Sequence, residues 1–162
     1  MSLDSVRAFL AEKAPDIAVI ELSTSTATVA LAAQGHGVTP AQIAKTLSLR
    51  VREQDLLVVT SGDARLDNKK FKAAFGGKAR MLGAEEVLAV TGHPIGGVCP
   101  FGLATPLPVY CDVSLKTFDE VVPAAGSAHS ALRINPLRMA ELAGAQWVDV
   151  CQPVGSIPLV QR

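Results

Sequence analysis

The sequence has only three cysteines among its 162 residues and no net formal charge. The cysteines form no CxxC pair, which favours reduced thiols in the cytoplasm over a disulfide framework. Fifteen basic residues balance fifteen acidic ones, so a nucleic-acid partner would have to be bound by a local patch. No apolar run reaches the ~18 residues of a spanning helix, and residues 1–16 lack the long apolar centre of a signal peptide. We therefore expect a cytoplasmic protein without a membrane partner.

The motifs of several common enzyme classes are also missing. No GxGxxG follows a predicted strand, and the Gly-Gly-Lys at 76–78 is not part of a GxxxxGK loop, because Lys72 occupies the position of its first glycine. No GxSxG surrounds Ser127. The histidines are scattered and match no metal-ligand spacing: His36, His93 and His129. The sequence therefore supports neither a nucleotide-phosphate loop, nor a serine hydrolase, nor a metal site.

What the sequence does contain is enough apolar material for one domain, since hydrophobic residues make up 49% of the chain. Caps and apolar spacing predict two well-defined helices, one between Asp67 and Gly76 and one that begins with Asn135 and Pro136. A third helix is expected to enter through Thr24 or Ser25 and to end at Gly35 or Gly37. Shorter helices are predicted at 5–14, 39–44 and 83–92.

Strands outnumber helices in this pattern. Residues 45–51 and 55–62 predict a hairpin around the polar turn between them. Further strands are expected at 16–22, 79–82, 107–113, 118–126, 130–134 and 146–154. The sequence therefore predicts a single α+β domain over residues 1–162 with a mixed, largely antiparallel sheet, and a loose tail from about residue 153.

One loop, "GHPIGGVCPFGL" at 92–103, combines four glycines and two prolines with a single thiol. It is either a tight structural corner or a place where the backbone itself binds a ligand. Cys99 could act as a nucleophile with His93 or His129 as its base, but a reduced cysteine more often packs as a small hydrophobic residue. We favour the packed thiol.

Positive charge gathers between residues 65 and 80, where six basic residues accompany the single acid Asp67: Arg65, Lys69, Lys70, Lys72, Lys78 and Arg80. This pattern fits a solvated helix face and phosphate contacts equally well. Lys45 opens an apolar strand, so its charge must reach solvent or a cleft, and spacing alone does not distinguish the two.

Two stretches in this order, "QIAKTLSLRV" and "TGHPIGGVCPFGL", resemble the YbaK-type family of aminoacyl-tRNA deacylases, relatives of the editing domain in bacterial prolyl-tRNA synthetases. The resemblance extends roughly from residue 28 to residue 147. It implies a compact domain with a twisted, barrel-like mixed sheet flanked by helices. It also implies hydrolysis of the ester of a mischarged tRNA, typically tRNA for proline carrying another amino acid, with no metal or organic cofactor. The implied partners are the acceptor end of aminoacyl-tRNA and, as a second candidate, prolyl-tRNA synthetase, but not DNA.

The resemblance also suggests roles for individual residues. Lys45 matches the functional lysine of the family, and Gly96, Gly97 and Pro100 match its glycine-proline loop. Backbone amides of this loop, including those of Val98 and Cys99, would stabilise the oxyanion of ester hydrolysis. Lys45 would anchor the phosphate or ribose of the terminal adenosine, and the basic segment would contact acceptor-end phosphates. The attacking group would be water, or a thiol of the substrate itself.

Specificity is less defined by these motifs. The expected substrate-pocket residues are Thr46, Phe101, Gly102, Ser127 and His129. Family members acting on cysteinyl-tRNA carry an acidic residue beyond the second glycine turn, and residues 126–134 contain none. This leaves serine, threonine, alanine or a similar small amino acid. Two alternatives stay open beside this interpretation: a non-catalytic module that binds tRNA or a synthetase, and a hydrolase that uses Cys99.

Overall fold

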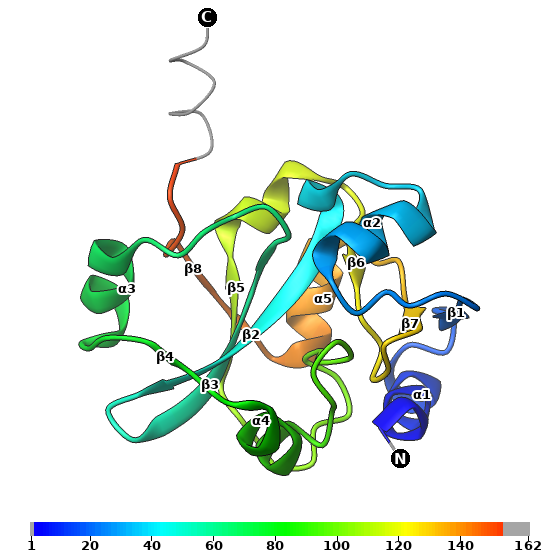
Figure 1. Ribbon diagram of the computed structural model, residues 1–162, viewed down its shortest axis with the longest axis horizontal. Coiled ribbons are helices and arrows are strands. Elements are labelled where there is room, and N and C mark those ends of the chain that lie inside the picture. Colours follow the sequence, from blue (N-terminus) through cyan, green and yellow to red (C-terminus); the bar gives the residue numbers. More distant parts are fainter. Residues whose placement is uncertain (1, 154–162) are drawn as a thin grey trace, which may run out of the picture.

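The computed structural model describes residues 2–153 of the protein (Figure 1). Five α-helices and two short 3-10 helices are present in this part: α1 (Ser2–Lys13), α2 (Val29–His36), α3 (Asn68–Phe75), α4 (Ala84–Thr91), α5 (Pro136–Ala143), η1 (Pro40–Gln42) and η2 (Val113–Thr117). The strands are β1 (Ile20–Glu21), β2 (Ile43–Val51), β3 (Gln54–Ser61), β4 (Arg80–Met81), β5 (Val109–Asp112), β6 (Val122–Pro123), β7 (Ser130–Ala131) and β8 (Gln146–Val148).

The central sheet has the strand order β4-β2-β3-β5-β8, and β6 pairs with the beginning of β2. The predicted hairpin is confirmed: β2 and β3 are antiparallel from Ala44↔Ser61 to Val51↔Gln54. The turn residues Arg52 and Glu53 both have positive φ, as a two-residue turn that matches the strand twist requires. Strands β5, β6 and β8 are added in parallel, and β1 pairs separately with β7. The predicted α+β fold with a mixed, twisted sheet flanked by helices is confirmed, although the sheet does not close into a barrel.

The β2–β3 hairpin forms the centre of the core because apolar side chains leave both of its faces. On one face, Leu57 packs with Val6 of α1 and Met139 of α5. On the other face, Val58 packs with Phe71 of α3. The helices therefore lie on both sides of the hairpin and hold it rigidly between two apolar clusters.

The capping residues predicted for two of the helices are confirmed. The Asp67 carboxylate accepts hydrogen bonds from the amides of Lys69 and Lys70, and Gly76 ends α3 in the left-handed region. The side-chain oxygen of Asn135 likewise accepts from the first turn of α5.

The start predicted for the helix before Gly37 is wrong by about one turn. Helix α2 begins at Val29 with Thr28 as its cap, because hydrogen bonds of Thr26 to a distant loop keep the chain before it out of the helix. Both the amide and the hydroxyl of Thr26 donate to the carbonyl of Ala128, which keeps the preceding segment extended along a distant loop. The helix propensities of the residues near Thr26 give no indication of a contact with Ala128.

Several predicted strands are shorter than expected, notably those at 16–22 and 118–126, of which only Ile20–Glu21 and Val122–Pro123 are regular. The predicted tail lies outside the described residues beyond Pro153. Among the described helices, none is both long and apolar enough to cross a bilayer.

Candidate functional site

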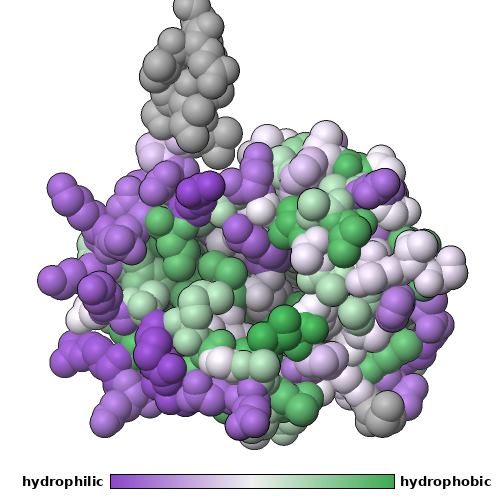
Figure 2. All heavy atoms as spheres, viewed as in Figure 1, coloured by the Kyte–Doolittle hydropathy of each residue, from purple (hydrophilic) through white to green (hydrophobic). Residues whose placement is uncertain are grey.

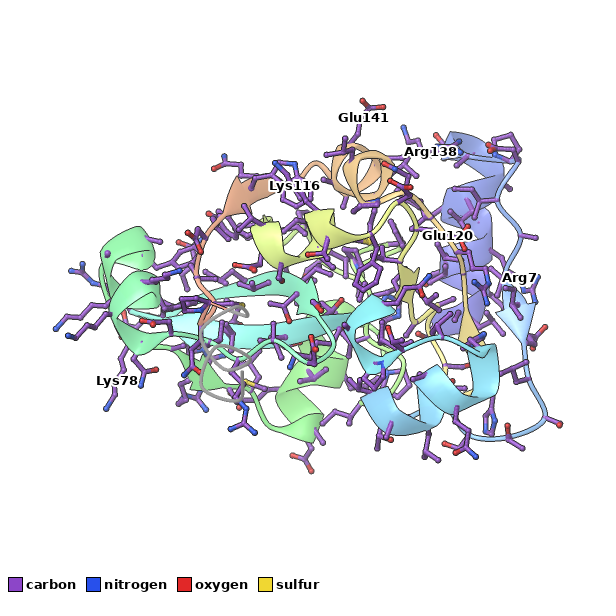
Figure 3. All side chains as sticks on the ribbon, turned by 90° about the horizontal axis from the view of Figure 1, so that it is seen from above. Arg7, Lys78, Lys116, Glu120, Arg138 and Glu141 are labelled. Atoms are coloured by element: carbon purple, nitrogen blue, oxygen red, sulfur yellow. The ribbon has the colours of Figure 1, made fainter. Side chains whose placement is uncertain are left out.

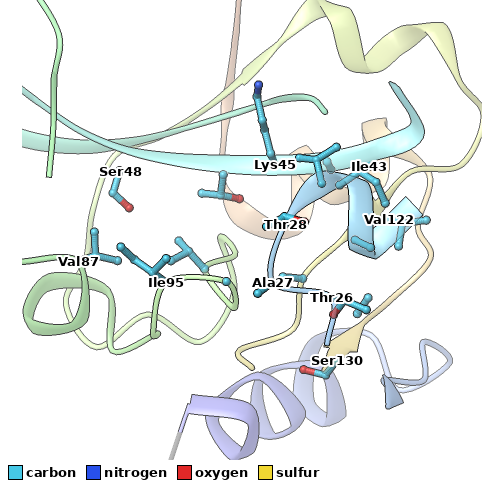
Figure 4. A pocket seen from close by; sticks show the side chains of 18 of the residues that line it. Thr26, Ala27, Thr28, Ile43, Lys45, Ser48, Val87, Ile95, Val122 and Ser130 are labelled. Atoms are coloured by element: carbon cyan, nitrogen blue, oxygen red, sulfur yellow. The ribbon is translucent and has the colours of Figure 1, made fainter. Parts of the chain in front are cut away.

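A cavity of about 220 Å³ lies between strand β2, the segment that leads into α2 and the loop at 92–103, which is called the glycine loop below (Figure 4). Parts of β4, α4, β6 and β7 complete its walls. The lining is mostly apolar, and Lys45 is the only residue of the described lining with an ionisable side chain. Across residues 2–153, no three His, Cys, Asp or Glu side chains gather in an arrangement that could hold a metal ion.

Strand β2 contributes five residues to the lining of this cavity: Ile43, Ala44, Lys45, Thr46 and Ser48. Ala44, Thr46 and Ser48 share one face of the strand, since successive residues of a strand point to opposite sides. Figure 4 shows the Ser48 hydroxyl directed into the cavity, on the side of Val87 and Ile95. The expected pocket residue Thr46 therefore lies at the cavity, together with Ser48, which the sequence-based prediction missed. Polar residues at 46 and 48 of a predicted strand were a usable signal, because they share a face.

The glycine loop reaches the cavity through a close contact between two backbone segments. A side chain at Gly97 would place its Cβ 2.5 Å from the Ser127 amide nitrogen, so only glycine fits there without a shift. The amide of Gly126 donates to the carbonyl of Gly97 at 2.9 Å, which joins the two segments. Gly96 has a φ of 93°, a conformation that side chains rarely adopt.

The loop amides differ in whether they are free to bind a ligand. The amide of Gly97 donates to the carbonyl of Pro94 at 2.9 Å and is not available. Gly96 and Val98 both line the cavity, and within the described chain the amide of neither makes a hydrogen bond. The loop therefore offers the amides of Gly96 and Val98, rather than that of Gly97, to a ligand in the cavity.

Helix α1 supports the glycine loop from behind. The positions of Gly102 and Gly126 leave no room for a Cβ, which would lie 2.7 Å from the carbonyl oxygens of Ser5 and Ser2 respectively. The hydroxyl of Ser5 lies 2.7 Å from the Ser2 carbonyl and 3.1 Å from the Gly102 carbonyl, and its single proton can be donated to either. Both backbone segments that shape the site thus rest on the first turns of one helix.

His93 fixes the same region through its two ring nitrogens. Its Nε2 lies 2.7 Å from the carbonyl of Phe101, which can only accept, so Nε2 carries the proton and Nδ1 accepts from the hydroxyl of Ser2. Burial lowers the pKa of His93, which keeps the ring neutral. The histidine is therefore a structural group and not a base exposed to a substrate.

The thiol of Cys99 is sealed in the core and does not reach the cavity. Its Sγ lies 3.7 Å from Nε2 of His93 and 3.6 Å from the carbonyl of Phe101, with no exposed surface. Burial raises the pKa of Cys99 to about 12, so the sulfur is a protonated thiol near neutral pH. This geometry argues against Cys99 as the nucleophile and agrees with the packed thiol that the sequence favoured. Pro100 is buried beside it.

For the ester hydrolysis expected from the sequence, Cys99→Ala should stay within about twofold of the wild-type rate, because a small apolar side chain replaces a small apolar thiol in the core. Steady-state kinetics at equal temperature would measure this. A loss of activity with an unchanged melting temperature would contradict it and restore the thiol to the mechanism.

Lys45 lies at the edge of the site rather than inside it. Figure 4 shows its side chain leaving β2 on the side opposite the Ser48 hydroxyl. Its Nζ donates to the carbonyl of Ala64 at 2.6 Å. Burial lowers the pKa of the Lys45 ammonium, the nearby groups of Cys151 and Asp63 oppose this shift, and Arg65 adds to it. The amine therefore faces the loop after β3.

Four of the predicted pocket residues do not line the cavity. Phe101 is fully buried against Phe9 in the core, and Gly102 contacts helix α1. Ser127 shares a hydrogen bond with Ser130, and it is Ser130 that lines the cavity. His129 is exposed, and its ring bonds to the carbonyl of Thr24. Residues of the glycine loop do line the cavity, but the sequence contains no signal for which side of each turn faces inward.

The basic segment surrounds helix α3 and strand β4, at the opposite end of the molecule from α1 (Figure 1). Figure 2 shows hydrophilic side chains gathered on this side, next to a more hydrophobic hollow, and Figure 3 shows Lys78 directed outward. Two members are paired: Lys70 with Asp149 at 3.0 Å and Arg80 with Glu86 at 3.3 Å. The other four are exposed, and no described acid forms an ion pair with them: Arg65, Lys69, Lys72 and Lys78.

Comparison with known proteins identifies a family that this chain matches. The model of the aminoacyl-tRNA editing domain matches residues 23–142. The chain is 50% identical over 154 residues to "Uncharacterized protein YwhH" of Bacillus subtilis, which covers 94% of this chain and 98% of the relative. It is 26% identical over 120 residues, 73% of each chain, to "Putative Cys-tRNA(Pro)/Cys-tRNA(Cys) deacylase EbsC" of Enterococcus faecalis. A solved structure described as "a putative trans-editing enzyme for prolyl tRNA synthetase" superposes with a TM-score of 0.86 at 37% identity, covering 94% of this chain and 98% of that chain.

Proposed function

Because this chain belongs to the aminoacyl-tRNA editing domain family, we propose that it hydrolyses the ester of a mischarged aminoacyl-tRNA, with tRNA for proline carrying a small non-cognate amino acid as the expected substrate. One observation carries the proposal. The described lining of the cavity presents two unpaired backbone amides, of Gly96 and Val98, and no acidic, histidine or thiol side chain. Such a site suits a reaction whose main demand is stabilisation of a developing negative oxygen.

The chemistry would proceed through a tetrahedral intermediate. A water oxygen attacks the ester carbonyl carbon, and the carbonyl oxygen becomes an oxyanion that accepts hydrogen bonds from Gly96 and Val98. The bond to the ribose oxygen then breaks, the ribose oxygen takes up a proton in place of the one that the attacking water gives up, and the free amino acid leaves. Loss of one such donor typically raises the barrier by about 3–4 kcal/mol. Because the loop is fixed by its contact with Gly126 and Ser127, its amides need little reorganisation during the reaction.

Lys45 has a different role in this proposal. Its ammonium uses one donor on the Ala64 carbonyl, which leaves two N–H groups for the terminal phosphate or ribose of the tRNA. Arg65 is exposed on the same loop and could add a second positive charge. The charge would hold the nucleic acid while the glycine loop holds the ester.

The basic segment supplies a route for the rest of the acceptor end. Strand β4 connects the two regions, since Met81 lines the cavity while Arg80 beside it belongs to the basic segment. Phosphate contacts position a nucleic acid without reading its sequence. The relative described as a trans-editing enzyme for prolyl tRNA synthetase makes that synthetase a second candidate partner.

We expect Lys69→Glu combined with Lys72→Glu to weaken tRNA binding by about tenfold or more, because each exposed lysine that neutralises a phosphate contributes through counterion release. The slope of log Kd against log salt concentration should become less steep by about 0.9 for each duplex phosphate that the variant no longer neutralises. Binding titrations at several salt concentrations would measure both quantities.

Lys13→Glu provides the control for this prediction. Lys13 is exposed in the last turn of α1, far from α3. Its reversal should change tRNA affinity far less than the double variant does. Equal affinity of the double variant and the wild type, with an unchanged salt slope, would remove the basic segment from the proposal.

The function itself is tested with a panel of tRNAs for proline that carry different amino acids. Release of each amino acid over time, compared with spontaneous hydrolysis, should show acceleration for at least one small non-cognate residue and little for proline. Binding of the same tRNAs without acceleration would identify a non-catalytic module instead. If the protein neither binds these tRNAs nor accelerates their deacylation, both functions are refuted.

A further inference from the structure

Two residues that line the cavity carry hydroxyl groups with no hydrogen-bond partner within residues 2–153. These are the Oγ1 of Thr46 and the Oγ of Ser48, both of which are fully removed from solvent at the oxygen atom. Ser48 as a whole residue is only 5% exposed. Buried hydroxyls are nearly always hydrogen-bonded, so a pair of them on one face of a strand and in one cavity requires an explanation.

The other hydroxyls of the lining are all engaged. Thr26 donates to the carbonyl of Ala128, Thr28 accepts from an amide in the first turn of α2, and Ser130 pairs with Ser127. Among the hydroxyl groups of the described lining, the ones without a partner are therefore confined to the two residues of β2. The backbone of Ser48 is paired, because its carbonyl accepts a hydrogen bond from the Leu82 amide, so only its hydroxyl lacks a partner among the described residues.

The surroundings of these two hydroxyls limit what could bind them. Val87 and Ile95 line the same part of the cavity, and its described lining offers no carboxylate or histidine to balance a charge. A cationic side chain would lose its hydration there without a carboxylate to compensate it, and the only counter-charge in the described lining for an anionic one is Lys45, whose side chain leaves the opposite face of β2. A purely apolar side chain would leave both hydroxyls unpaired. A short side chain with one hydroxyl of its own would satisfy the site, because a hydroxyl both donates and accepts.

We propose that Ser48 and Thr46 are specificity-determining residues that select an aminoacyl group carrying a side-chain hydroxyl, as in serine or threonine. This inference rests on the proposed function, because it assigns the cavity to the amino acid of the ester. A site built to hydrogen-bond a substrate hydroxyl discriminates strongly against the analogue that lacks it, since its own polar groups are then left unpaired.

The test uses two pairs of esters on the same tRNA, each pair equal in size but different in the hydroxyl. Seryl is compared with 2-aminobutyryl, and threonyl with valyl. We expect wild-type kcat/KM to favour the hydroxylated member of at least one pair by about tenfold or more. In Ser48→Ala and in Thr46→Val that preference should shrink several-fold, mainly through slower hydrolysis of the hydroxylated ester.

A stability measurement separates this role from a structural one. Because the Ser48 hydroxyl has no partner among the described residues, Ser48→Ala should leave the melting temperature unchanged or raise it. Ser61→Ala is the matched control: its hydroxyl lies outside the cavity and donates to the carbonyl of Ala41 at 2.6 Å. That variant should melt at a lower temperature and retain the wild-type ester preference.

The outcomes are distinct. The inference is overturned if the wild type hydrolyses both members of each pair at equal rates. It is also overturned if the preference is unchanged in both variants. Either result would leave the proposed deacylation intact. Failure to hydrolyse any ester of the panel would instead overturn the proposed function and the inference with it. A preference that disappears only in Ser48→Ala would assign the selection to that residue alone.

Discussion

Replacing Gly97 with alanine is expected to lower kcat/KM for deacylation by about a hundredfold or more. The new Cβ would lie 2.5 Å from the amide nitrogen of Ser127 and 2.7 Å from the carbonyl carbon of Gly126, so one of the two backbone segments must move. The amides of Gly96 and Val98 flank this position and would move with it. Displacement of catalytic groups by about 1 Å is enough to cost about 100-fold in rate.

Gly83→Ala is the control for that result. Gly83 has a φ of −74°, and the nearest atom to a Cβ there is a side-chain oxygen of Glu86 at 3.8 Å, so alanine fits without strain. It should retain activity. Kinetics and thermal unfolding of both variants would be compared, and a folded Gly97→Ala protein with wild-type kcat/KM would show that the geometry of the loop does not set the rate.

The second large effect is expected for Lys45→Ala, which should reduce kcat/KM by about 10- to 100-fold, as the loss of a charge-assisted hydrogen bond typically does. Because the ammonium is proposed to bind the nucleic acid and not the reacting atoms, most of the loss should appear in KM. Removal of the side chain also leaves the Ala64 carbonyl without its donor, so thermal unfolding should be followed in parallel.

Lys45→Met and Lys45→Arg refine this test. Methionine keeps the length and apolar stem of the side chain without its charge, and it should behave like alanine. Arginine keeps the charge and should restore part of the affinity. Full activity of Lys45→Met would show that the ammonium has no function in the reaction.

The local elements of this fold were predictable where one residue decides the structure. Asp67 and Gly76 delimit α3, and the polar turn between β2 and β3 makes the hairpin, because these signals lie within a few residues of the element that they determine. The start of α2 was missed because a contact with Ala128, about a hundred residues away, holds Thr26 extended. Short strands such as β6 are similarly defined by partners distant in sequence.

The candidate site was predictable only in outline. The glycine loop and Thr46 were placed at the site from sequence, and the structure brings both to one cavity. The sequence did not reveal that the Gly97 amide donates to the carbonyl of Pro94. Nor did it reveal that the Lys45 side chain leaves β2 on the face opposite the Ser48 hydroxyl. Both facts depend on how the chain turns in three dimensions. The identity of one residue in a motif does not indicate its hydrogen-bond partner or the direction of its side chain.

The support that α1 gives to the glycine loop has a consequence for how short the protein can be made. The family match begins at residue 23, yet Ser2 and Ser5 hold the two glycine segments from outside that range. A fragment trimmed to the matched boundaries would keep every residue proposed to touch the ester and still lose the scaffold behind them. We therefore expect that a fragment able to perform the proposed reaction has to include the amino-terminal helix.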